Sequence, residues 1–224
     1  MKVAVLGAGP AGLYFAISMK RRNPAHDITV VERNRPDDTF GWGVVLSAET
    51  LDHLTDNDPV STAWIRDHFA YWDDVAVYHG GQRTVSTGHG FCGIGRRRLL
   101  LLLQRRANEL GIRLVFETEI DDPRPYMETH DLVVAADGLN SRSRATFADV
   151  FKPDIDVRKC KFVWLGTRQK FDDAFTFIFE KTEHGWVWAH AYQFEPETAT
   201  FIVECSDETW RRFGFDGMSR EDSI

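Results

Sequence analysis

The chain has 224 residues, of which 43% are hydrophobic and 27% charged, and its formal net charge at pH 7 is −7. This length fits one large domain or two small ones, with enough apolar content for a folded core. The acidic balance argues against nucleic acid or an anionic membrane surface as the main partner. No apolar run reaches transmembrane length. We therefore expect a cytoplasmic protein that binds neither nucleic acid nor membranes. The sequence does not indicate its oligomeric state.

Cysteine and histidine spacing gives no sign of a metal centre. The three cysteines, Cys92, Cys160 and Cys205, are far apart and form no Cys-x-x-Cys pair. This spacing argues against disulfide and zinc frameworks and favours reduced, buried thiols. The eight histidines include no His-x-x-x-His pair. The sequence therefore predicts no metal site.

The chain begins with a pattern typical of a strand, a turn and a helix. Val3–Leu6 form a short apolar run, as expected for a buried parallel strand, and residues 13–20 have a helix-forming composition. Between them, Gly7, Gly9 and Gly12 follow the spacing G-x-G-x-x-G. Such glycines allow a sharp turn, let a pyrophosphate approach the backbone, and let the helix pack closely on the strand.

A second predicted strand supports a nucleotide site. Ile28–Val31 form this strand, and Glu32 follows it, twenty residues after Gly12. A carboxylate at this position can accept hydrogen bonds from an adenosine ribose, while the phosphates meet the helix N-terminus. A glycine-rich turn that binds nothing remains the alternative.

The next segment mixes loops, helices and antiparallel strands. Glycines on both sides of Trp42 indicate either backbone close to a ligand or an ordinary turn around a packed tryptophan. The other expected elements are a loop at 33–40, a helix from Ala48 capped by Ser47, a helix from Ser61 to about Phe69, and a hairpin of strands 74–78 and 83–87. The hairpin interrupts the α/β pattern and predicts a second, antiparallel layer.

A cluster of arginines opens the next predicted helix. Arg96 and the two arginines after it precede five leucines, which predicts a long buried helix ending at Gly111. Positive charge at a helix N-terminus opposes the macrodipole. We therefore expect an anion nearby, such as the phosphates of a flavin dinucleotide, with three solvated arginines as the alternative.

The remaining chain divides into an α/β part and a β-rich part. Residues 112–116 predict a strand that 117–120 extend, and residues 131–136 predict a buried strand. Gly138 is expected in a left-handed conformation, with Ser141 capping a short helix.

From residue 155 onward, four β-rich segments predict a meander. Trp186, Trp188, His190 and Tyr192 alternate and therefore share one face. That face is either a surface for an aromatic ring or a plain aromatic core.

Three separated motifs resemble those of the flavin-dependent aromatic hydroxylases, the single-component class built like p-hydroxybenzoate hydroxylase. They are the glycine motif with Glu32 and Arg33, the helix led by Arg96, and DLVVAADGLNSRSR with its Asp137–Gly138 pair. FGWGVVLSAETL, FTFIFEKTEHG and TFIVECSDETW are similar to the members that act on aromatic CoA thioesters such as salicylyl-CoA and 2-aminobenzoyl-CoA. The GWGVV and AHAY elements are also similar to tryptophan hydroxylases, which keeps an indole substrate open.

The resemblance implies an α/β fold with two domains. A Rossmann-like FAD-binding domain with a parallel sheet would comprise 1–74 and 96–150, and an antiparallel substrate domain 75–95 and 151–224. The family also has a Gly-Asp motif near a long C-terminal helix, and this chain has no Gly-Asp dipeptide. We therefore expect an N-terminal fragment of a longer enzyme, with its substrate domain truncated.

The implied cofactor is FAD, reduced by NADPH or NADH. Reduced flavin would take up O2 as a C4a-hydroperoxide and hydroxylate an aromatic substrate, such as an aromatic CoA thioester. A non-catalytic flavin-binding module is the alternative class of function. The implied cofactor-binding residues are Gly7, Gly9, Ala11, Gly12, Glu32, Arg33, Arg96, Ile120, Asp137 and Gly138. The candidate substrate-binding residues are Trp186, Trp188, His190 and Tyr192. No catalytic side chain and no metal ligand is assigned.

Overall fold

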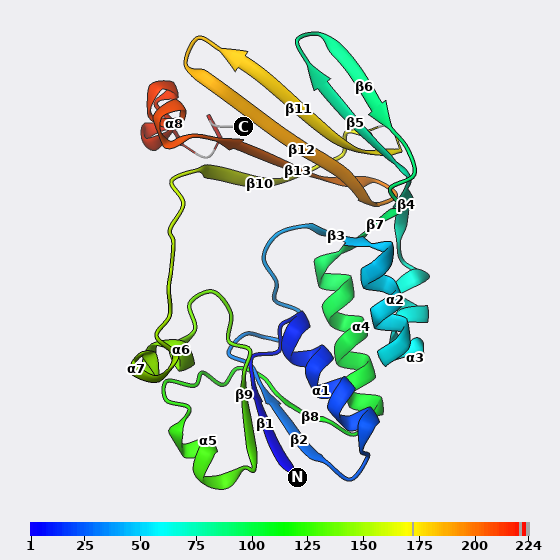
Figure 1. The fold of residues 1–224 in the computed structure, drawn as a ribbon, viewed down its shortest axis with the longest axis vertical. Coiled ribbons are helices and arrows are strands. Elements are labelled where there is room, and N and C mark those ends of the chain that lie inside the picture. Colours follow the sequence, from blue (N-terminus) through cyan, green and yellow to red (C-terminus); the bar gives the residue numbers. More distant parts are fainter. Residues whose placement is uncertain (172, 220, 223–224) are drawn as a thin grey trace. The chain divides into compact units, whose positions relative to one another are not determined.

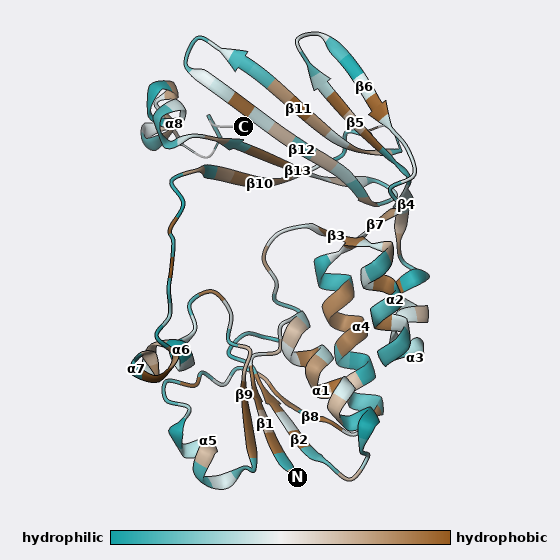
Figure 2. Ribbon diagram, viewed as in Figure 1, coloured by the Kyte–Doolittle hydropathy of each residue, from teal (hydrophilic) through white to brown (hydrophobic). Residues whose placement is uncertain are grey.

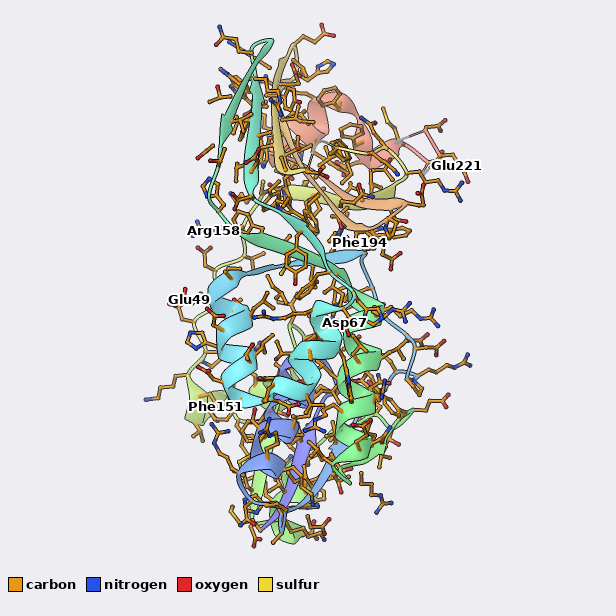
Figure 3. The ribbon with its side chains drawn as sticks, turned by 90° about the vertical axis from the view of Figure 1, so that its right-hand side faces the viewer. Glu49, Asp67, Phe151, Arg158, Phe194 and Glu221 are labelled. Carbon is orange, nitrogen blue, oxygen red and sulfur yellow. The ribbon has the colours of Figure 1, made fainter. Side chains whose placement is uncertain are left out.

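The computed structural model describes residues 1–171, 173–219 and 221–222, and the chain forms two compact units (Figure 1). Unit 1 consists of Met1–Phe40, Leu51–Asp67 and Arg96–Ile155, and unit 2 of Gly41–Thr50, His68–Gly95 and Asp156–Ile224. Figure 3 labels Glu49, Asp67 and Arg158, which lie close to places where the chain passes from one unit to the other.

Unit 1 is built on a parallel sheet with the strand order β8-β2-β1-β9. Its strands are β1 (Lys2–Leu6), β2 (Asp27–Val31), β8 (Arg113–Val115) and β9 (Leu132–Ala135). The helices are α1 (Pro10–Arg22), α2 (Ala48–Asn57), α3 (Pro59–Arg66), α4 (Arg96–Glu109), α5 (Arg124–Thr129), α6 (Arg142–Thr146) and α7 (Ala148–Phe151), of which α2 begins within the residues of unit 2. Hydrophobic residues concentrate in β1, β9 and α4 (Figure 2).

The core of unit 1 surrounds β1. Val3, Val5 and Leu6 are almost completely buried, as are Leu13 and Ile17 on α1. This agrees with the expectation that an apolar run before a glycine motif forms the central strand. Because the strands are parallel, the residues that follow β1, β2 and β9 meet at one edge of the sheet.

Several local predictions are confirmed. The Ser47 Oγ accepts a hydrogen bond from the Thr50 amide at 3.3 Å, which caps α2. The Ser141 Oγ accepts one from the Arg144 amide at 2.9 Å, which caps α6. Gly138 has the expected left-handed backbone, with φ +80°.

The expected cap and end of α3 are wrong. The Asp58 carboxylate accepts a hydrogen bond from the Ser61 amide, so Asp58 is the cap and the helix begins at Pro59. Ser61 is buried inside the first turn, and the helix ends at Arg66 rather than near Phe69. Proline at the first helical position favours this earlier start.

Two strand predictions also need correction. Residues 117–120 do not extend β8, because Glu117 has φ 54° and turns the backbone out of the extended conformation. Strand β9 is half-buried rather than buried, with Ala135 exposed. The reason is that β9 lies at the edge of the sheet instead of between two strands.

Unit 2 contains a six-stranded sheet of order β10-β13-β12-β11-β5-β6 and a three-stranded sheet of order β3-β7-β4. The strands of the large sheet are β5 (Asp74–His79), β6 (Gln82–Ser86), β10 (Lys161–Thr167), β11 (Ala174–Thr182), β12 (Gly185–Glu195) and β13 (Thr198–Cys205). Helix α8 (Asp207–Phe213) and a short 3-10 turn, η1 (Phe215–Gly217), follow.

The predicted meander is correct for β11, β12 and β13 but not for β10. β10 pairs with β13, because β11 already has β12 on one side and β5 on the other. The contact between β11 and β5 is parallel, so the hairpin of β5 and β6 continues the same sheet.

The small sheet moves two segments out of the expected nucleotide-binding domain. β3 (Gly43–Ser47) and β4 (Ala70–Trp72) both pair with β7 (Phe91–Gly95), which places 41–50 and 68–74 in unit 2. The glycine-rich sequence of β7 has little strand propensity, so the local sequence did not predict that this segment forms a strand.

The two sheets of unit 2 share an aromatic core. Trp72 stacks on Tyr192 with the ring centroids 5.8 Å apart, and the Tyr192 hydroxyl donates to the Gly43 carbonyl at 2.7 Å. A Cβ at Gly43 would lie 2.4 Å from the Phe194 ring, and one at Gly41 would lie 2.5 Å from the Trp164 ring. The glycines that flank Trp42 therefore make room for other aromatic rings of unit 2, while Trp42 itself is 44% exposed.

Candidate functional site

A cleft of about 680 Å³ lies in unit 1, next to the residues that follow β1, β2 and β9. The candidate cofactor residues that line it are Gly7, Gly9, Ala11, Glu32, Arg33, Arg96, Ile120, Asp137 and Gly138. Gly12 is not among the lining residues. The fold thus brings together groups that are as far apart in sequence as the glycine motif and the Asp137–Gly138 pair.

The glycine motif shapes one wall of the cleft. A Cβ at Gly7 would lie 2.3 Å from the Ala136 carbonyl oxygen, and one at Gly12 would lie 2.0 Å from the Gly7 carbonyl oxygen. These two glycines therefore let β1, β9 and α1 approach closely. A Cβ at Gly9, by contrast, would meet no atom within 4 Å. Gly9 borders open space, where a ligand can reach the backbone.

The start of α1 presents free amides to this space. Its N-cap residue, Gly9, supplies no side-chain hydrogen bond, and the first turn contains no acidic residue. The first amides of a helix have no partner within the helix, and the dipole favours negative charge there. The arrangement suits a pyrophosphate beside Gly9 and Ala11.

Glu32 is fixed at the edge of the cleft by two backbone amides. Its Oε2 accepts from the Ala8 amide at 2.8 Å, and its Oε1 accepts from the Asn34 amide at 2.9 Å. Each carboxylate oxygen can accept more than one hydrogen bond, so both keep capacity for ribose hydroxyls. Arg33 lies on the rim, with its guanidinium 4.0 Å from the Glu119 carboxylate.

Arg96 is the member of the arginine cluster that lines the cleft. Its Nε is buried and has no hydrogen-bond partner in the part of the chain that the structure describes. Burial lowers the pKa of Arg96, and the guanidinium lies 4.0 Å from the centroid of the Phe40 ring. Arg97 instead forms an exposed ion pair with Asp37 at 3.2 Å. A buried guanidinium nitrogen without a hydrogen-bond partner is costly, so this site fits a polar or anionic group.

Asp137 lines the cleft and holds the start of α6. Its Oδ1 accepts from the Ser141 hydroxyl at 2.6 Å, and its Oδ2 accepts from the Ser143 amide at 3.0 Å. Burial alone would raise the pKa of Asp137, but these hydrogen bonds outweigh it and lower the pKa below its usual value. The carboxylate therefore stays ionised while it holds the start of α6 beside the cleft.

The four candidate substrate-binding residues lie together on β12 in unit 2, on the face that also carries Phe175 and Phe177 of β11. Tyr192 is buried and bound to Gly43, so it belongs to the core. Trp186 is 45% exposed and stacks on His79. Trp188 and His190 are half-buried, so this part of the face is open to a ligand.

Sequence reasoning missed three groups. Phe40 lies under the Arg96 guanidinium, and Arg142 forms an ion pair of 2.8 Å with Glu119 at the rim of the cleft. Glu204 of β13 accepts a hydrogen bond from the Trp188 indole. Glu204 has the same alternation parity as Thr198 and Thr200 in its strand, but only the pairing register shows which neighbours it meets.

The described residues contain no group of three or more His, Cys, Asp or Glu side chains placed to hold a metal ion. No helix among them has both the length and the apolar character that crossing a membrane requires.

The sequence of this chain is similar to those of known oxidoreductases. Residues 1–93 match the family described as pyridine nucleotide-disulphide oxidoreductase. The chain is 45% identical over 218 residues to a salicyloyl-CoA 5-hydroxylase of Streptomyces sp, a match that covers 97% of this chain and 42% of that protein. It is 36% identical over 225 residues to protodeoxyviolaceinate monooxygenase of Chromobacterium violaceum, covering 100% of this chain and 60% of that protein. The chain thus spans about half the length of these curated relatives.

A solved structure confirms the fold. The tetrameric form of 2-methyl-3-hydroxypyridine-5-carboxylic acid oxygenase superposes with a TM-score of 0.77 at 19% identity, over 92% of this chain and 58% of that one. The combination of a Rossmann-like parallel sheet with antiparallel sheets is therefore that of known oxygenases. The resemblance inferred from the motifs is confirmed as well: the chain is a relative of the flavin-dependent aromatic monooxygenases.

Proposed function

We propose that the chain forms the dinucleotide-binding part, and a portion of the ring-binding part, of an FAD-dependent monooxygenase that hydroxylates an aromatic substrate with O2 and NADPH or NADH. The observation that carries this proposal is the cleft of unit 1. It combines open space at Gly9, a carboxylate fixed at Glu32 and the buried Arg96 Nε, which has no hydrogen-bond partner in the described structure.

The residues of the cleft fit the parts of FAD. The amides that open α1, next to Gly9 and Ala11, would bind the pyrophosphate, and Glu32 would bind the adenosine ribose. Arg96 would contact an anionic or polar part of the flavin half, with Asp137 near the ribityl region. When bound, FAD supplies the activation of O2, while the protein binds and orients the reactants and limits access of water.

An aromatic CoA thioester such as salicylyl-CoA is the proposed substrate. The support is the 45% identity to a protein named salicyloyl-CoA 5-hydroxylase, together with the aromatic face of β12. A tryptophan- or indole-type substrate is the second candidate, since the relative at 36% identity is named protodeoxyviolaceinate monooxygenase. Trp186, Trp188 and His190 are the residues proposed to meet the ring.

Titration of the purified chain with FAD tests the nucleotide site. Wild type should bind one FAD per chain and show the visible flavin absorption band. Gly9→Val keeps a compatible backbone, since Gly9 has φ −66° and ψ 174°, but it fills the open space. We expect this variant to bind FAD at least about tenfold more weakly.

Gly217→Val is the matched control, because a Cβ at Gly217 also meets no atom within 4 Å but lies in unit 2. It should bind FAD like wild type. A wild-type chain that binds no FAD, or equal affinities for both variants, contradicts the proposal. The rate of NADPH or NADH oxidation is then measured with and without salicylyl-CoA. A rate that salicylyl-CoA increases indicates an enzyme, and an unchanged rate indicates a non-catalytic flavin-binding module.

A further inference from the structure

Two polar side chains lie on the otherwise apolar centre of the β12 face. His190 pairs with Phe177 of β11 and Ile202 of β13. One step along the sheet, Trp188 pairs with Phe179 and Glu204. His190 and Glu204 are therefore diagonal neighbours on one face, within reach of the same ligand. The other residues paired with them on β11 and β13 are aromatic or aliphatic: Phe177, Phe179 and Ile202.

The polar atoms of this pair are available to a ligand. Glu204 accepts from the Trp188 indole through Oε2, which fixes its carboxylate on the face. Among the described residues, Glu204 has no Lys or Arg within ion-pair distance, and neither ring nitrogen of His190 has a hydrogen-bond partner. The His190 ring instead contacts Phe175 and Phe177, with centroid separations of 5.8 and 5.9 Å.

The electrostatics of the pair are acidic. Burial lowers the pKa of His190, while the charge of Glu204 opposes that shift. The imidazole is thus favoured in its neutral form, and Glu204 supplies the negative charge of these two rows. A neutral imidazole and a carboxylate can both accept hydrogen bonds. A ligand carboxylate placed here would face a like charge in a half-buried environment.

We propose that Glu204 and His190 determine specificity on this face: they accept a hydrogen bond from a hydroxyl or amine on the ligand ring, and Glu204 disfavours rings that carry a free carboxylate. The inference rests on the proposed function, because it takes this face as the place where the ring binds. It goes further in selecting neutral, donor-bearing aromatic ligands over aryl carboxylates, with Glu204 as the discriminating residue.

Calorimetric titration with two small probes tests the selection. Salicylamide and salicylate share the ring hydroxyl and differ in whether the second substituent is neutral or charged. We expect wild type to bind salicylamide about tenfold more tightly than salicylate, as like-charge repulsion requires. Glu204→Gln keeps the side-chain shape and an acceptor for Trp188, and should reduce the ratio to about twofold by strengthening salicylate binding.

Glu180→Gln is the matched control. Glu180 is exposed and pairs with Val187, so it lies on the opposite face of β11. Glu180→Gln changes the net charge by the same amount as Glu204→Gln. It should leave the ratio of salicylamide to salicylate affinity at the wild-type value. His190→Phe keeps a ring on the face but removes the acceptor, and should weaken salicylamide binding about threefold or more.

Three results would overturn the inference. They are equal affinity of wild type for the two probes, the same ratio in Glu204→Gln and Glu180→Gln, and no binding of either probe at millimolar concentration. FAD titration of the same samples keeps the proposed function separate. If one of these results is found while FAD binds normally, only the specificity proposal is contradicted. If wild type does not bind FAD, the proposed nucleotide site is contradicted.

Discussion

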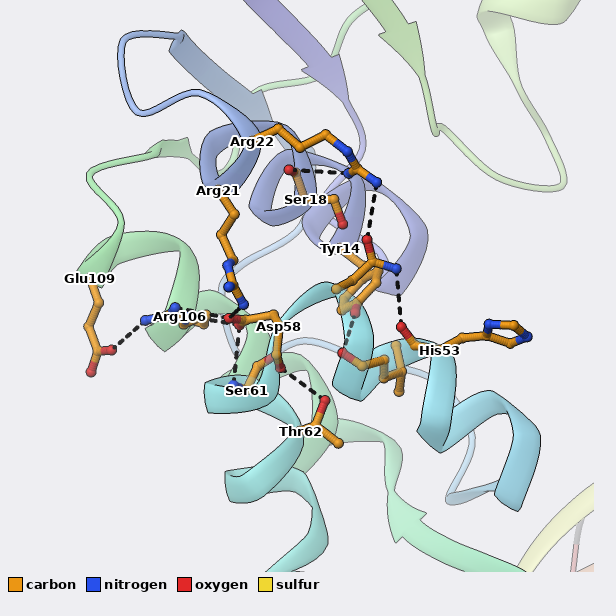
Figure 4. Close-up of polar contacts among 12 residues, drawn as sticks. Tyr14, Ser18, Arg21, Arg22, His53, Asp58, Ser61, Thr62, Arg106 and Glu109 are labelled. Carbon is orange, nitrogen blue, oxygen red and sulfur yellow. Dashed lines mark hydrogen bonds and ion pairs between the residues drawn. The ribbon is translucent and has the colours of Figure 1, made fainter.

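Arg106 holds the buried carboxylate of Asp58 through two nitrogens, with Nε 2.8 Å from Oδ2 and Nη2 2.9 Å from Oδ1 (Figure 4). Arg21 reaches Oδ1 at 2.5 Å, so one carboxylate joins α1, α3 and α4. The helices α1 and α4 begin at the cleft, next to Gly9 and Arg96. Asp58 thus ties together the two helices whose N-termini form the candidate nucleotide site.

Replacing Asp58 by Asn should destabilise the chain by about 3–5 kcal/mol, since it leaves partly buried cations without their counter-charge. The Asp58 side chain is completely buried, and that of Arg106 is only 13% exposed. Urea unfolding monitored by circular dichroism gives the free energy of unfolding. Asp122→Asn is the control, because the ion pair of Asp122 with Arg124 lies at the surface. Equal loss of stability in both variants would contradict the role of the cluster.

The stabilisation by Asp58 should depend on pH in a defined direction. Burial alone would raise the pKa of Asp58, but hydrogen bonds from Arg106, Ser61 and Arg21 and the charge of Arg106 outweigh it and lower the pKa. A lowered folded-state pKa stabilises the fold above the unfolded-state value of about 3.9, and this contribution is lost as pH falls through the folded-state value.

The difference in unfolding free energy between wild type and Asp58→Asn should therefore be constant near neutral pH and shrink below about pH 4. Urea titrations of both proteins across this range measure it. A difference that grows on acidification would show that the carboxylate is not held in its ionised form.

The contrast between Glu32 and Asp58 shows what the sequence could predict. Glu32 follows a strand at the spacing expected after the glycine motif, so the sequence located it, and its amide partners are Asn34, two residues on, and Ala8 within that motif. Asp58 and Arg106 are 48 residues apart, and only the packing of three helices brings them together. The same holds for Glu204, whose neighbours depend on the register of β12 and β13. Local turns and caps follow from residue type, whereas long-range pairs depend on tertiary packing.

Arg96→Met should separate stability from cofactor binding. The Arg96 guanidinium is partly desolvated and its Nε has no partner in the described structure, so methionine should raise the free energy of unfolding of the FAD-free chain by about 1 kcal/mol. The same change removes the cation that lines the cleft, and should weaken FAD binding about tenfold.

Thermal unfolding without FAD and a flavin titration measure these two effects. Arg97→Met is the matched control, since Arg97 is exposed and paired with Asp37. It should change neither quantity appreciably. If Arg96→Met instead destabilises the FAD-free chain and binds FAD normally, the arginine has a structural role alone.

Glu204→Gln should lower the pKa of His190 further. Burial already disfavours the imidazolium, and the negative charge of Glu204 is the interaction that opposes this effect. Removing that charge leaves burial unopposed, so the direction of the shift is fixed. A pH titration of histidine signals by NMR measures it, with His190→Phe identifying the resonance among the eight histidines. Glu180→Gln, on the opposite face, should leave the pKa unchanged. An unchanged or raised pKa in Glu204→Gln would mean that the two side chains do not interact, and the polar pair of the β12 face would not exist in solution.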